Sequence, residues 1–363
     1  MNEVVLYRKY RPKNFSEVLG QDHIVNVLKR ALELNRVAHA YLFAGPYGTG
    51  KTTVARILAR AAACNAGGAR PCNKCEICEE FLAGHAFDLV ELDAASSRGI
   101  DEIRTLREAA ELMPFRAPYK VYIIDEVHML TREAFNALLK TLEEPPAHVI
   151  FILATTELAK VPDTIISRCQ KFDFHKIPEE VLQKSLVAMA KKEGAEIDAE
   201  AVGLVSLFAD GSFRDAQSML GQLVSVSGGK IAGNDVRMLF GAPPAHLVEQ
   251  MMDAILAKNP EQAVCVVDEM VKSGIDSQIF LKFLLRDFRN AFLLKMRPEY
   301  EKELAQMMPD GAVAGLRKNA DKAREKELEQ ILSLLIEIYG ARRLSYLPHL
   351  PLELAVVKAA MRQ

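Results

Sequence analysis

The sequence predicts an α/β fold with a parallel, doubly wound sheet, followed by a region built of helices only. Short apolar runs alternate with helix-like segments up to about residue 174, which is the pattern of βα units with a parallel sheet. The motif Gly45-Pro-Tyr-Gly-Thr-Gly-Lys-Thr52 lies between the apolar run Ala40 to Ala44 and a helix-like segment that starts at Lys51. From residue 178 onward the apolar residues recur at helical spacing.

The glycine motif fits Gly-x4-Gly-Lys-Ser/Thr, the pattern of a phosphate-binding loop. Its glycines permit positive φ, so backbone N–H groups can close on phosphate oxygens beside a helix N-terminus. Lys51 is expected to reach the β- and γ-phosphates of a nucleotide, and Thr52 to ligate Mg²⁺, with Thr53 a second candidate. A chance match in a glycine-rich turn is disfavoured by the flanking strand and helix. The expected binding residues of the loop are Gly45, Gly48, Thr49, Gly50, Lys51, Thr52 and Thr53.

Length and charge narrow the class of protein. A chain of 363 residues should form two or three domains. The 46 basic and 48 acidic residues give a net charge of −2, so any nucleic-acid binding must come from local patches or from an assembly. No apolar run approaches the ~20 residues that span a membrane, and the first eight residues do not resemble a signal peptide. The expectation is a soluble, cytoplasmic protein with no membrane partner.

The N-terminal segment contains Tyr7-Arg-Lys-Tyr-Arg-Pro12, followed by a predicted helix. The tyrosine and arginine cluster is either a solvated segment or a strip that packs on an adenine base. In the helix, Ile24, Val27, Leu28 and Ala31 recur at i, i+3, i+4 and i+7 and are expected to form one buried face.

Four of the six cysteines fall within fifteen residues, at Cys64, Cys72, Cys75 and Cys78. This spacing predicts a zinc site, because Zn²⁺ takes four tetrahedral thiolates. A disulfide pair is disfavoured in a reducing compartment. Four thiolates leave no open position for water, so the site is predicted to be structural. The isolated Cys169 and Cys265 are expected to be packed thiols.

Two later strands are predicted to end at polar residues. Residues 87–92 are expected to form a short buried strand, and the apolar run from Val121 ends in Asp125 and Glu126. Asp125 is predicted to join the Mg²⁺ shell and Glu126 to polarise the attacking water. Acidic pairs at strand ends are also common as solvated groups, but an upstream phosphate loop favours the catalytic interpretation.

Residues 148–156 predict another strand, with Thr155 and Thr156 at the carboxyl end, where α/β sheets bind ligands. A short helix then leads to Ser167-Arg168-Cys169, and residues 171–174 predict a last strand.

The helix-only region from 178 to 240 includes a predicted capping box, with Ser212 at the N-cap and Asp215 at N3. Arg214 lies in the first turn of that helix, and an exposed capping-turn arginine is its simplest interpretation. Residues 241–245 predict a linker. One later helix, with Leu328, Ile331 and Leu335 on its apolar face, is either the centre of a bundle or an interface between chains, with the interface slightly favoured.

The order of motifs resembles that of AAA+ ATPases. Gly-x4-Gly-Lys-Thr, Ile-Ile-Asp-Glu, Ala-Thr-Thr, Ser-Arg-Cys and Gly-Ser-Phe-Arg-Asp match the Walker A, Walker B, sensor 1, arginine-finger and sensor 2 elements. The Tyr-Arg-Pro opening, the cysteine insertion and Ser-Arg-Cys narrow the resemblance to bacterial clamp loaders, and the chain closely resembles the gamma/tau subunits of bacterial DNA polymerase III along essentially its whole length.

This resemblance implies an AAA+ P-loop NTPase core at 1–177 with a zinc module at about 64–78, an all-α lid at 178–240 and an all-α collar at 241–363. It implies a DNA-dependent ATPase motor that uses ATP and Mg²⁺, with Zn²⁺ bound in the module. In a pentameric ring with other clamp-loader subunits, the motor opens the sliding clamp and loads it onto primer-template DNA as part of the DNA polymerase III holoenzyme. Longer relatives carry a further tail, so the chain is expected to be the motor and collar portion.

Individual roles follow from the resemblance. Thr155 would sense the γ-phosphate, Arg214 would contact it from the lid, and Arg168 would act on ATP in the neighbouring subunit. Arg98, near a helix N-terminus, resembles positions that touch template phosphates. The residues implied at the adenine are Tyr7, Arg11 and Val18.

Two other classes of protein share part of this pattern. A branch-migration helicase has both Walker motifs, but the cysteine module and Ser-Arg-Cys argue against it. A non-hydrolysing clamp-loader scaffold has the cysteine module but a damaged phosphate loop, whereas the loop is intact here. Nothing resembles a polymerase active site, so a polymerase activity would belong to the holoenzyme.

Overall fold

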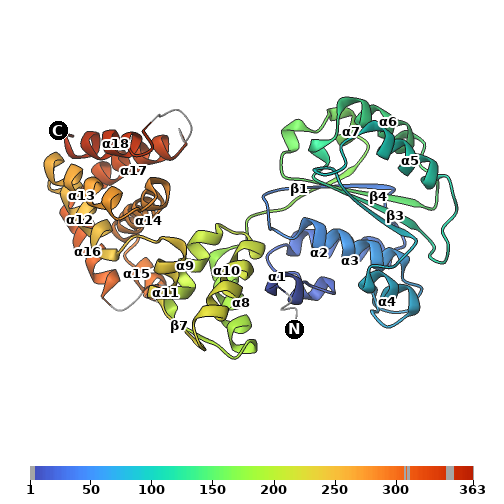
Figure 1. Cartoon of the computed structure of the whole chain (residues 1–363), viewed down its shortest axis with the longest axis horizontal. Helices are drawn as coiled ribbons and strands as arrows, with labels where there is room; N and C mark the ends of the chain where they lie inside the picture. Colours follow the sequence, from blue (N-terminus) through green and yellow to red (C-terminus); the bar gives the residue numbers. More distant parts are fainter. Residues whose placement is uncertain (1–4, 306–307, 309–310, 341–346, 363) are drawn as a thin grey trace. The chain divides into compact units, whose positions relative to one another are not determined.

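The computed structural model describes residues 5–305, 308, 311–340 and 347–362 (Figure 1). The chain divides into two compact units. The first consists of residues 1–185 and 206–221, and the second of residues 186–205 and 222–363. Within the described part of the chain, no helix combines the length and the apolar character needed to cross a membrane.

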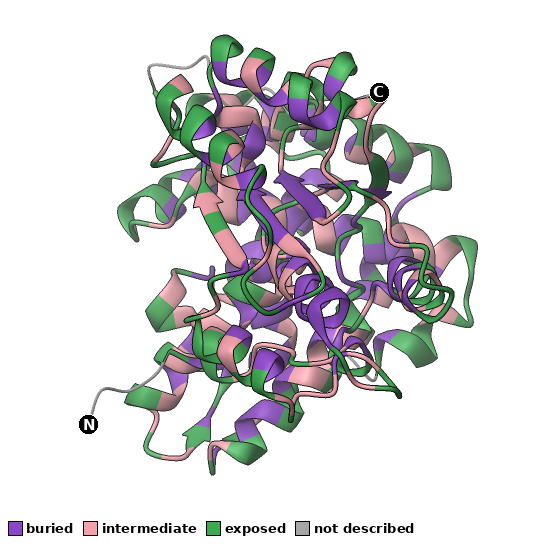
Figure 2. Cartoon of the chain, turned by 90° about the vertical axis from the view of Figure 1, so that its right-hand side faces the viewer, coloured by how far each residue is buried: buried purple, intermediate pink, exposed green. Residues whose placement is uncertain are grey.

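The first unit is built on a five-stranded parallel sheet with the order β2-β3-β4-β1-β5. The strands are β1 (Ala40–Ala44), β2 (Leu89–Asp93), β3 (Lys120–Asp125), β4 (Val149–Thr155) and β5 (Gln170–Asp173). All residues of β1 and β4 are buried, as expected for strands covered on both faces, and they are purple in Figure 2. The predicted parallel α/β fold is confirmed.

Helices cover both faces of this sheet. They are α2 (Asp22–Glu33), α3 (Lys51–Ala63), α4 (Glu76–Ala83), α5 (Ile100–Ala110), α6 (Arg132–Glu143) and α7 (Asp163–Ile166). Because strand side chains alternate between faces, Tyr41 and Phe43 enter one hydrophobic cluster with α2 and α3. Leu42 and Tyr122 enter the other cluster, with α5, α6 and α7. The sheet is therefore doubly wound, with α2 and α3 drawn below it and α5 to α7 above it in Figure 1.

Two details of the sequence prediction are wrong in this unit. Val27 of α2 is 46% exposed, and the buried face consists of Ile24, Val25, Leu28 and Leu32. The second strand begins at Leu89 instead of Phe87, which is 76% exposed. β2 is an edge strand, and its residues are half-buried or exposed, because one side of it has no neighbouring strand.

The first unit also contains four short helices: α1 (Leu6–Lys9) and the 3₁₀ turns η1 (Phe15–Glu17), η2 (Val127–Met129) and η3 (Leu158–Lys160). Three longer helices include residues of both units: α8 (Glu179–Lys192), α9 (Ala199–Ala209) and α10 (Phe213–Val226). Residues 178–240 are not purely helical, since β6 (Glu196–Ile197) and β7 (Lys230–Ile231) form a small parallel pair in the second unit. The prediction of helices only is corrected there.

The rest of the second unit is helical. Its helices are α11 (Gly233–Phe240), α12 (Ala245–Leu256), α13 (Pro260–Lys272), α14 (Ser277–Met296), α15 (Tyr300–Leu304), α16 (Ala312–Lys322), α17 (Glu325–Gly340) and α18 (Leu350–Ala360). In α17, Leu328, Ile331 and Leu335 are buried, and the helix lies against α14 and α18. Ile336 of α17 is 60% exposed, so part of the apolar surface of this helix is not covered by other residues of this chain.

Candidate functional site

The glycine motif forms a loop between the buried strand β1 and helix α3. Gly45, Gly48 and Gly50 all have positive φ, as predicted. At Gly48 a side chain is also excluded by space, because an added Cβ would lie 1.9 Å from the Ser212 hydroxyl oxygen. The Phe213 N–H donates to the Gly48 carbonyl oxygen over 3.0 Å. The start of α10 therefore sits directly on the loop.

Lys51, the first residue of α3, is 5% exposed. Its Nζ donates to the carbonyl oxygens of Gly45 and Pro46, each at 2.8 Å. Burial lowers the pKa of Lys51, while the negative charges of Glu126 and Asp125 act in the opposite direction. A phosphate in the loop would add a direct counterion and favour the charged ammonium.

The end of β3 meets the first turn of α3. The Thr52 Oγ1 donates to Asp125 Oδ2 over 2.7 Å, although the two residues are 73 positions apart. Asp125 ends β3 at the carboxyl edge of the sheet, and α3 starts at the same edge because it follows the loop after β1. A hydroxyl and a carboxylate oxygen are ligands that Mg²⁺ accepts, so this pair fits a magnesium site next to the loop.

Glu126 follows Asp125 in a left-handed conformation with φ of 48°. Its Oε2 accepts hydrogen bonds from Thr156, at 2.8 Å from the hydroxyl and 3.2 Å from the N–H. The carboxylate is thereby anchored to the end of β4, one residue past Thr155.

Sequence reasoning missed His128, which connects these groups. Its Nδ1 lies 3.1 Å from Thr155 Oγ1 and 3.3 Å from Glu126 Oε2, and its Nε2 lies 3.4 Å from Glu157 Oε1. The side chain is only 5% exposed. Thr155 is fully buried and also accepts from the Glu157 N–H. The only signal in the sequence was a histidine two positions after the acidic pair.

Gln21 was missed as well. Its amide nitrogen donates to the carbonyl oxygens of His175, at 2.7 Å, and of Thr49, at 3.4 Å. Its oxygen accepts from the His175 N–H. Gln21 is fully buried, so it ties the loop to the segment after β5. Thr49 itself is 2% exposed and donates to the Pro46 carbonyl oxygen.

Arg214 lies in the first turn of α10 and contacts two aromatic rings. Its Cζ is 5.0 Å from the centroid of Tyr7 and 5.1 Å from that of Tyr47. The predicted cap is present, since the Asp215 N–H donates to the Ser212 Oγ over 3.2 Å. Of the other residues expected at an adenine, Val18 is part of the hydrophobic core and Arg11 is half-buried.

Arg168 follows α7 and is not joined to the loop by any contact within the described residues. Its Nη2 lies 2.6 Å from Glu143 Oε1 of α6, and its Nη1 donates to the Thr164 carbonyl oxygen over 2.8 Å. Arg98 is exposed before α5, where its Nε donates to the Ala95 carbonyl oxygen over 3.0 Å. Both arginines lie outside the loop site of their own chain.

The four clustered cysteines converge as predicted. The sulfur atoms of Cys64, Cys72, Cys75 and Cys78 all lie within 4.8 Å of one another, and those of Cys72 and Cys78 are 3.9 Å apart. Four thiolates around zinc at ~2.3 Å imply sulfur separations of roughly 3.8 Å, so the donor set fits Zn²⁺. Hydrogen bonds from the N–H groups of Lys74 and Cys75 lower the pKa of Cys72 to about 6, which favours the thiolate that a metal needs.

The two remaining cysteines differ from each other. Cys169 packs against the hydrophobic cluster that contains Leu42 and Tyr122, and burial raises the pKa of its thiol to about 12. Cys265 is exposed. The expectation of a packed thiol at Cys265 is therefore wrong, because α13 presents that position to solvent.

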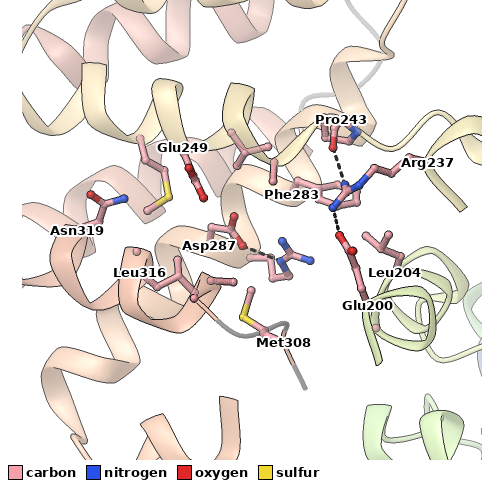
Figure 3. Close-up of a pocket in the computed structure, with 18 residues that line it drawn as sticks. Glu200, Leu204, Arg237, Pro243, Glu249, Phe283, Asp287, Met308, Leu316 and Asn319 are labelled. Carbon is pink, nitrogen blue, oxygen red and sulfur yellow. Dashed lines mark hydrogen bonds and ion pairs between the residues drawn. The ribbon is translucent and has the colours of Figure 1, made fainter. Parts of the chain in front are cut away.

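The second unit contains a cavity of about 410 Å³ between α9, α11, α12, α14 and α16 (Figure 3). Its two arginines are already paired. Arg237 binds Glu200 and the Pro243 carbonyl oxygen, and Arg286 Nε donates to Asp287 Oδ1 over 2.7 Å. Neither is left as a free cation for a phosphate, so the loop of the first unit remains the candidate site.

Comparisons with known proteins identify related sequences over most of the chain. Residues 20–178 match the family described as DNA polymerase III, delta subunit, and residues 231–363 match DNA polymerase III subunits gamma and tau domain III. DNA polymerase III subunit tau of Bacillus subtilis is 38% identical over 359 residues, which cover 99% of this chain and 63% of that protein. DNA polymerase III subunit gamma of Buchnera aphidicola subsp. Schizaphis graminum is 38% identical over 300 residues, covering 82% of this chain and 83% of that protein.

Among solved structures, the RuvB Holliday junction branch migration motor of Thermotoga maritima is similar with a TM-score of 0.48 and 19% identity, covering 68% of this chain and 79% of that one. A TM-score and a sequence identity this low assign no activity to this chain. The chain spans less than two thirds of the Bacillus relative's length.

Proposed function

The chain belongs to the family of DNA polymerase III gamma and tau subunits, and on that premise we propose that it is the ATPase motor of a clamp loader. It binds ATP and Mg²⁺ at the loop, hydrolyses ATP, and uses the energy to open a sliding clamp and load it onto primer-template DNA. The proposed setting is a pentameric ring with other clamp-loader subunits in the cytoplasm.

The observation that carries this proposal is the contact between Thr52 and Asp125. It places a hydroxyl and a carboxylate together beside a loop whose lysine is already directed at the loop carbonyls. An accidental glycine-rich turn needs no such acidic partner from another strand.

Each residue then has a proposed role. Lys51 and the loop N–H groups hold the β- and γ-phosphates. Thr52 and Asp125 would hold Mg²⁺, which would supply positive charge at the phosphates. Glu126 orients and polarises the attacking water. Thr155, at the end of the neighbouring strand β4, senses the γ-phosphate. Tyr7, Arg11 and Val18 flank the adenine. Arg168 and Arg214 supply charge at the γ-phosphate, the first toward a neighbouring subunit.

The cysteine cluster is proposed to hold one structural Zn²⁺. Cys64 directly follows α3 and Cys75 directly precedes α4, so the metal would join the helix that follows the phosphate loop to the inserted segment. When bound, it would crosslink four thiolates and leave no open position for water. No catalytic step is assigned to it.

We also propose a division into an ATPase core at 1–177, a lid at 178–240 and a collar at 241–363. The exposed apolar side chain of Ile336 on α17 supports contact between collars of neighbouring subunits. The whole assembly acts as a DNA-dependent ATPase of the polymerase holoenzyme, without polymerase chemistry in this chain.

The test is ATP binding and clamp loading by Lys51→Ala in the reconstituted ring. Loss of the ammonium should abolish loading and weaken ATP binding, while the fold is preserved. Lys184→Ala is the matched control, since the Lys184 side chain is 81% exposed in α8. Equal ATP affinity in Lys51→Ala and parent would overturn the assignment. ATP binding without DNA-stimulated hydrolysis in assembled parent rings would indicate a scaffold subunit instead.

A further inference from the structure

We propose that Tyr47 is a positioning residue for ATP binding, which together with Tyr7 holds the Arg214 guanidinium beside the phosphate loop. This inference rests on the proposed function. Tyr47 occupies one of the variable positions of the glycine motif, so the motif itself assigns it no role.

Three separate segments meet at Arg214. Tyr7 comes from α1, Tyr47 from the loop and Arg214 from the first turn of α10. The distances from the guanidinium carbon to the two ring centroids, 5.0 and 5.1 Å, are nearly equal. Both lie within the ~6 Å range of a cation–π contact. The guanidinium therefore makes cation–π contacts with two rings at once.

The backbone keeps Tyr47 and Arg214 in register. Gly48, next to Tyr47, accepts a hydrogen bond from the N–H of Phe213, next to Arg214. An added Cβ at Gly48 would lie 3.4 Å from the Arg214 Cβ and 1.9 Å from the Ser212 Oγ. The loop and the helix start thus touch through backbone, and the ring of Tyr47 and the side chain of Arg214 project from neighbouring positions.

The groups that contact the Arg214 guanidinium are aromatic rings and not carboxylates. Among the described residues, no carboxylate oxygen is close enough to Arg214 to form an ion pair, whereas Arg168 is paired with Glu143. Aromatic rings attract a guanidinium through their quadrupole but carry no net charge. Two tyrosines can therefore orient Arg214 without neutralising it. A carboxylate in the same place would compete with a phosphate for the cation.

This arrangement predicts selectivity for the third phosphate. Arg214 is proposed to contact the γ-phosphate, which ADP lacks, so the aid that Tyr47 gives to Arg214 should appear in triphosphate binding only. Tyr47 is 50% exposed, which corresponds to the weaker end of cation–π energies, and removal of its ring should weaken triphosphate binding about two- to fivefold.

The experiment measures dissociation constants of the full chain for ATPγS and ADP, both with Mg²⁺. Tyr47→Leu is expected to weaken ATPγS binding by the amount given above and to leave ADP binding unchanged. Tyr47→Phe keeps the ring and should bind ATPγS as the parent does. Tyr47 is the more informative of the two rings, because Tyr7 is also expected near the adenine and carries Arg8 at 5.9 Å.

A double-mutant cycle separates positioning from a general effect on the loop. In the Arg214→Ala background, Tyr47→Leu should have no further effect on ATPγS binding. Tyr300→Leu is the matched control, because it removes a similar contact, with Arg297 Cζ 5.4 Å from the ring centroid, in the second unit. It should leave both constants unchanged.

Three results would overturn the role of Tyr47: equal weakening for ADP, a Phe variant as weak as the Leu variant, or an undiminished effect in the Arg214→Ala background. Failure of the underlying function gives a different pattern. In that case the parent chain binds neither nucleotide, or Lys51→Ala binds ATPγS as well as the parent.

Discussion

Substituting Arg168 by alanine should separate a ring motor from a self-contained ATPase. In this chain the guanidinium is paired with Glu143, and the two side chains are 34% and 50% exposed. Exposed ion pairs contribute about 0–1 kcal/mol to stability, so the variant should fold normally. Because no contact of the described residues joins Arg168 to the loop of its own chain, nucleotide binding by the isolated chain should also be unchanged.

The effect on the ring should be far larger. An arginine finger contributes ~10³ to 10⁵ in turnover, because a guanidinium stays charged and can pair with two phosphoryl oxygens. DNA-stimulated hydrolysis should therefore collapse in rings of Arg168→Ala subunits. If Arg168 were only a capping residue at the end of α7, turnover would remain normal.

The assay mixes Arg168→Ala subunits with Lys51→Ala subunits and measures ATPase in assembled rings. A finger that acts on the neighbour restores part of the activity, since a Lys51→Ala subunit can donate its intact Arg168 to a subunit with an intact loop. Glu143→Gln is the control for the ion pair: it frees the guanidinium and should leave DNA-stimulated turnover at least at the parent level. Absence of rescue at every mixing ratio, with assembly demonstrated, would refute the reasoning.

Three further predictions concern the zinc cluster, the proposed DNA contact and the buried histidine. Cys75→Ser should reduce zinc from one ion per chain and loosen the insertion, with little direct effect on phosphate binding; metal analysis that finds no zinc in the parent would contradict it. Arg98→Ala should weaken DNA-stimulated ATPase more than basal ATPase, equally for all DNA sequences and less at high salt, and an unchanged DNA response would reduce Arg98 to a solvated residue. His128→Ala should lower kcat about tenfold while the dissociation constant for ATPγS stays constant, because a lost hydrogen bond to a charged group corresponds to about 1.5 kcal/mol or more. The exposed His85→Ala is its control, and a normal kcat in His128→Ala would remove His128 from the site.

Features that depend on short sequence spacing could be predicted well. The phosphate loop, the strand ends at Asp125 and Thr155, and the cysteine cluster each combine residue type with local backbone geometry, which a single sequence records. The parallel sheet followed from the same logic, because buried strands and helices alternate along the chain. Even here the strand boundaries shifted by one or two residues, as at Leu89.

Features that depend on which element packs against a helix or strand could not be predicted from the sequence. Apolar residues at 24, 25, 27 and 28 of α2 are compatible with two helical faces, and only the sheet beneath decides that Val25 is buried and Val27 exposed. Phe87 was assigned to a buried strand from its type. In the structure Phe87 precedes β2, and the centroid of its ring lies 5.6 Å from that of Phe115.

The contacts that organise the site are of a third kind, because they join residues far apart in the sequence. Gln21 reaches His175 across 154 positions, and Tyr47 reaches Arg214 from a different element. A single sequence contains no signal for such pairs, since glutamine and tyrosine are common at positions without any role. The residue types become informative only once the fold has placed them together.

The two candidate γ-phosphate arginines illustrate what the structure adds. From the sequence both are arginines near helix ends. The structure gives them opposite partners, a carboxylate for Arg168 and two neutral rings for Arg214. The ion pair with Glu143 keeps the Arg168 guanidinium in place in its own chain. We propose that a phosphate of the neighbouring subunit replaces this carboxylate as its partner. Rings hold a guanidinium without placing a negative charge beside it, which suits a residue whose anion arrives in the adjacent loop.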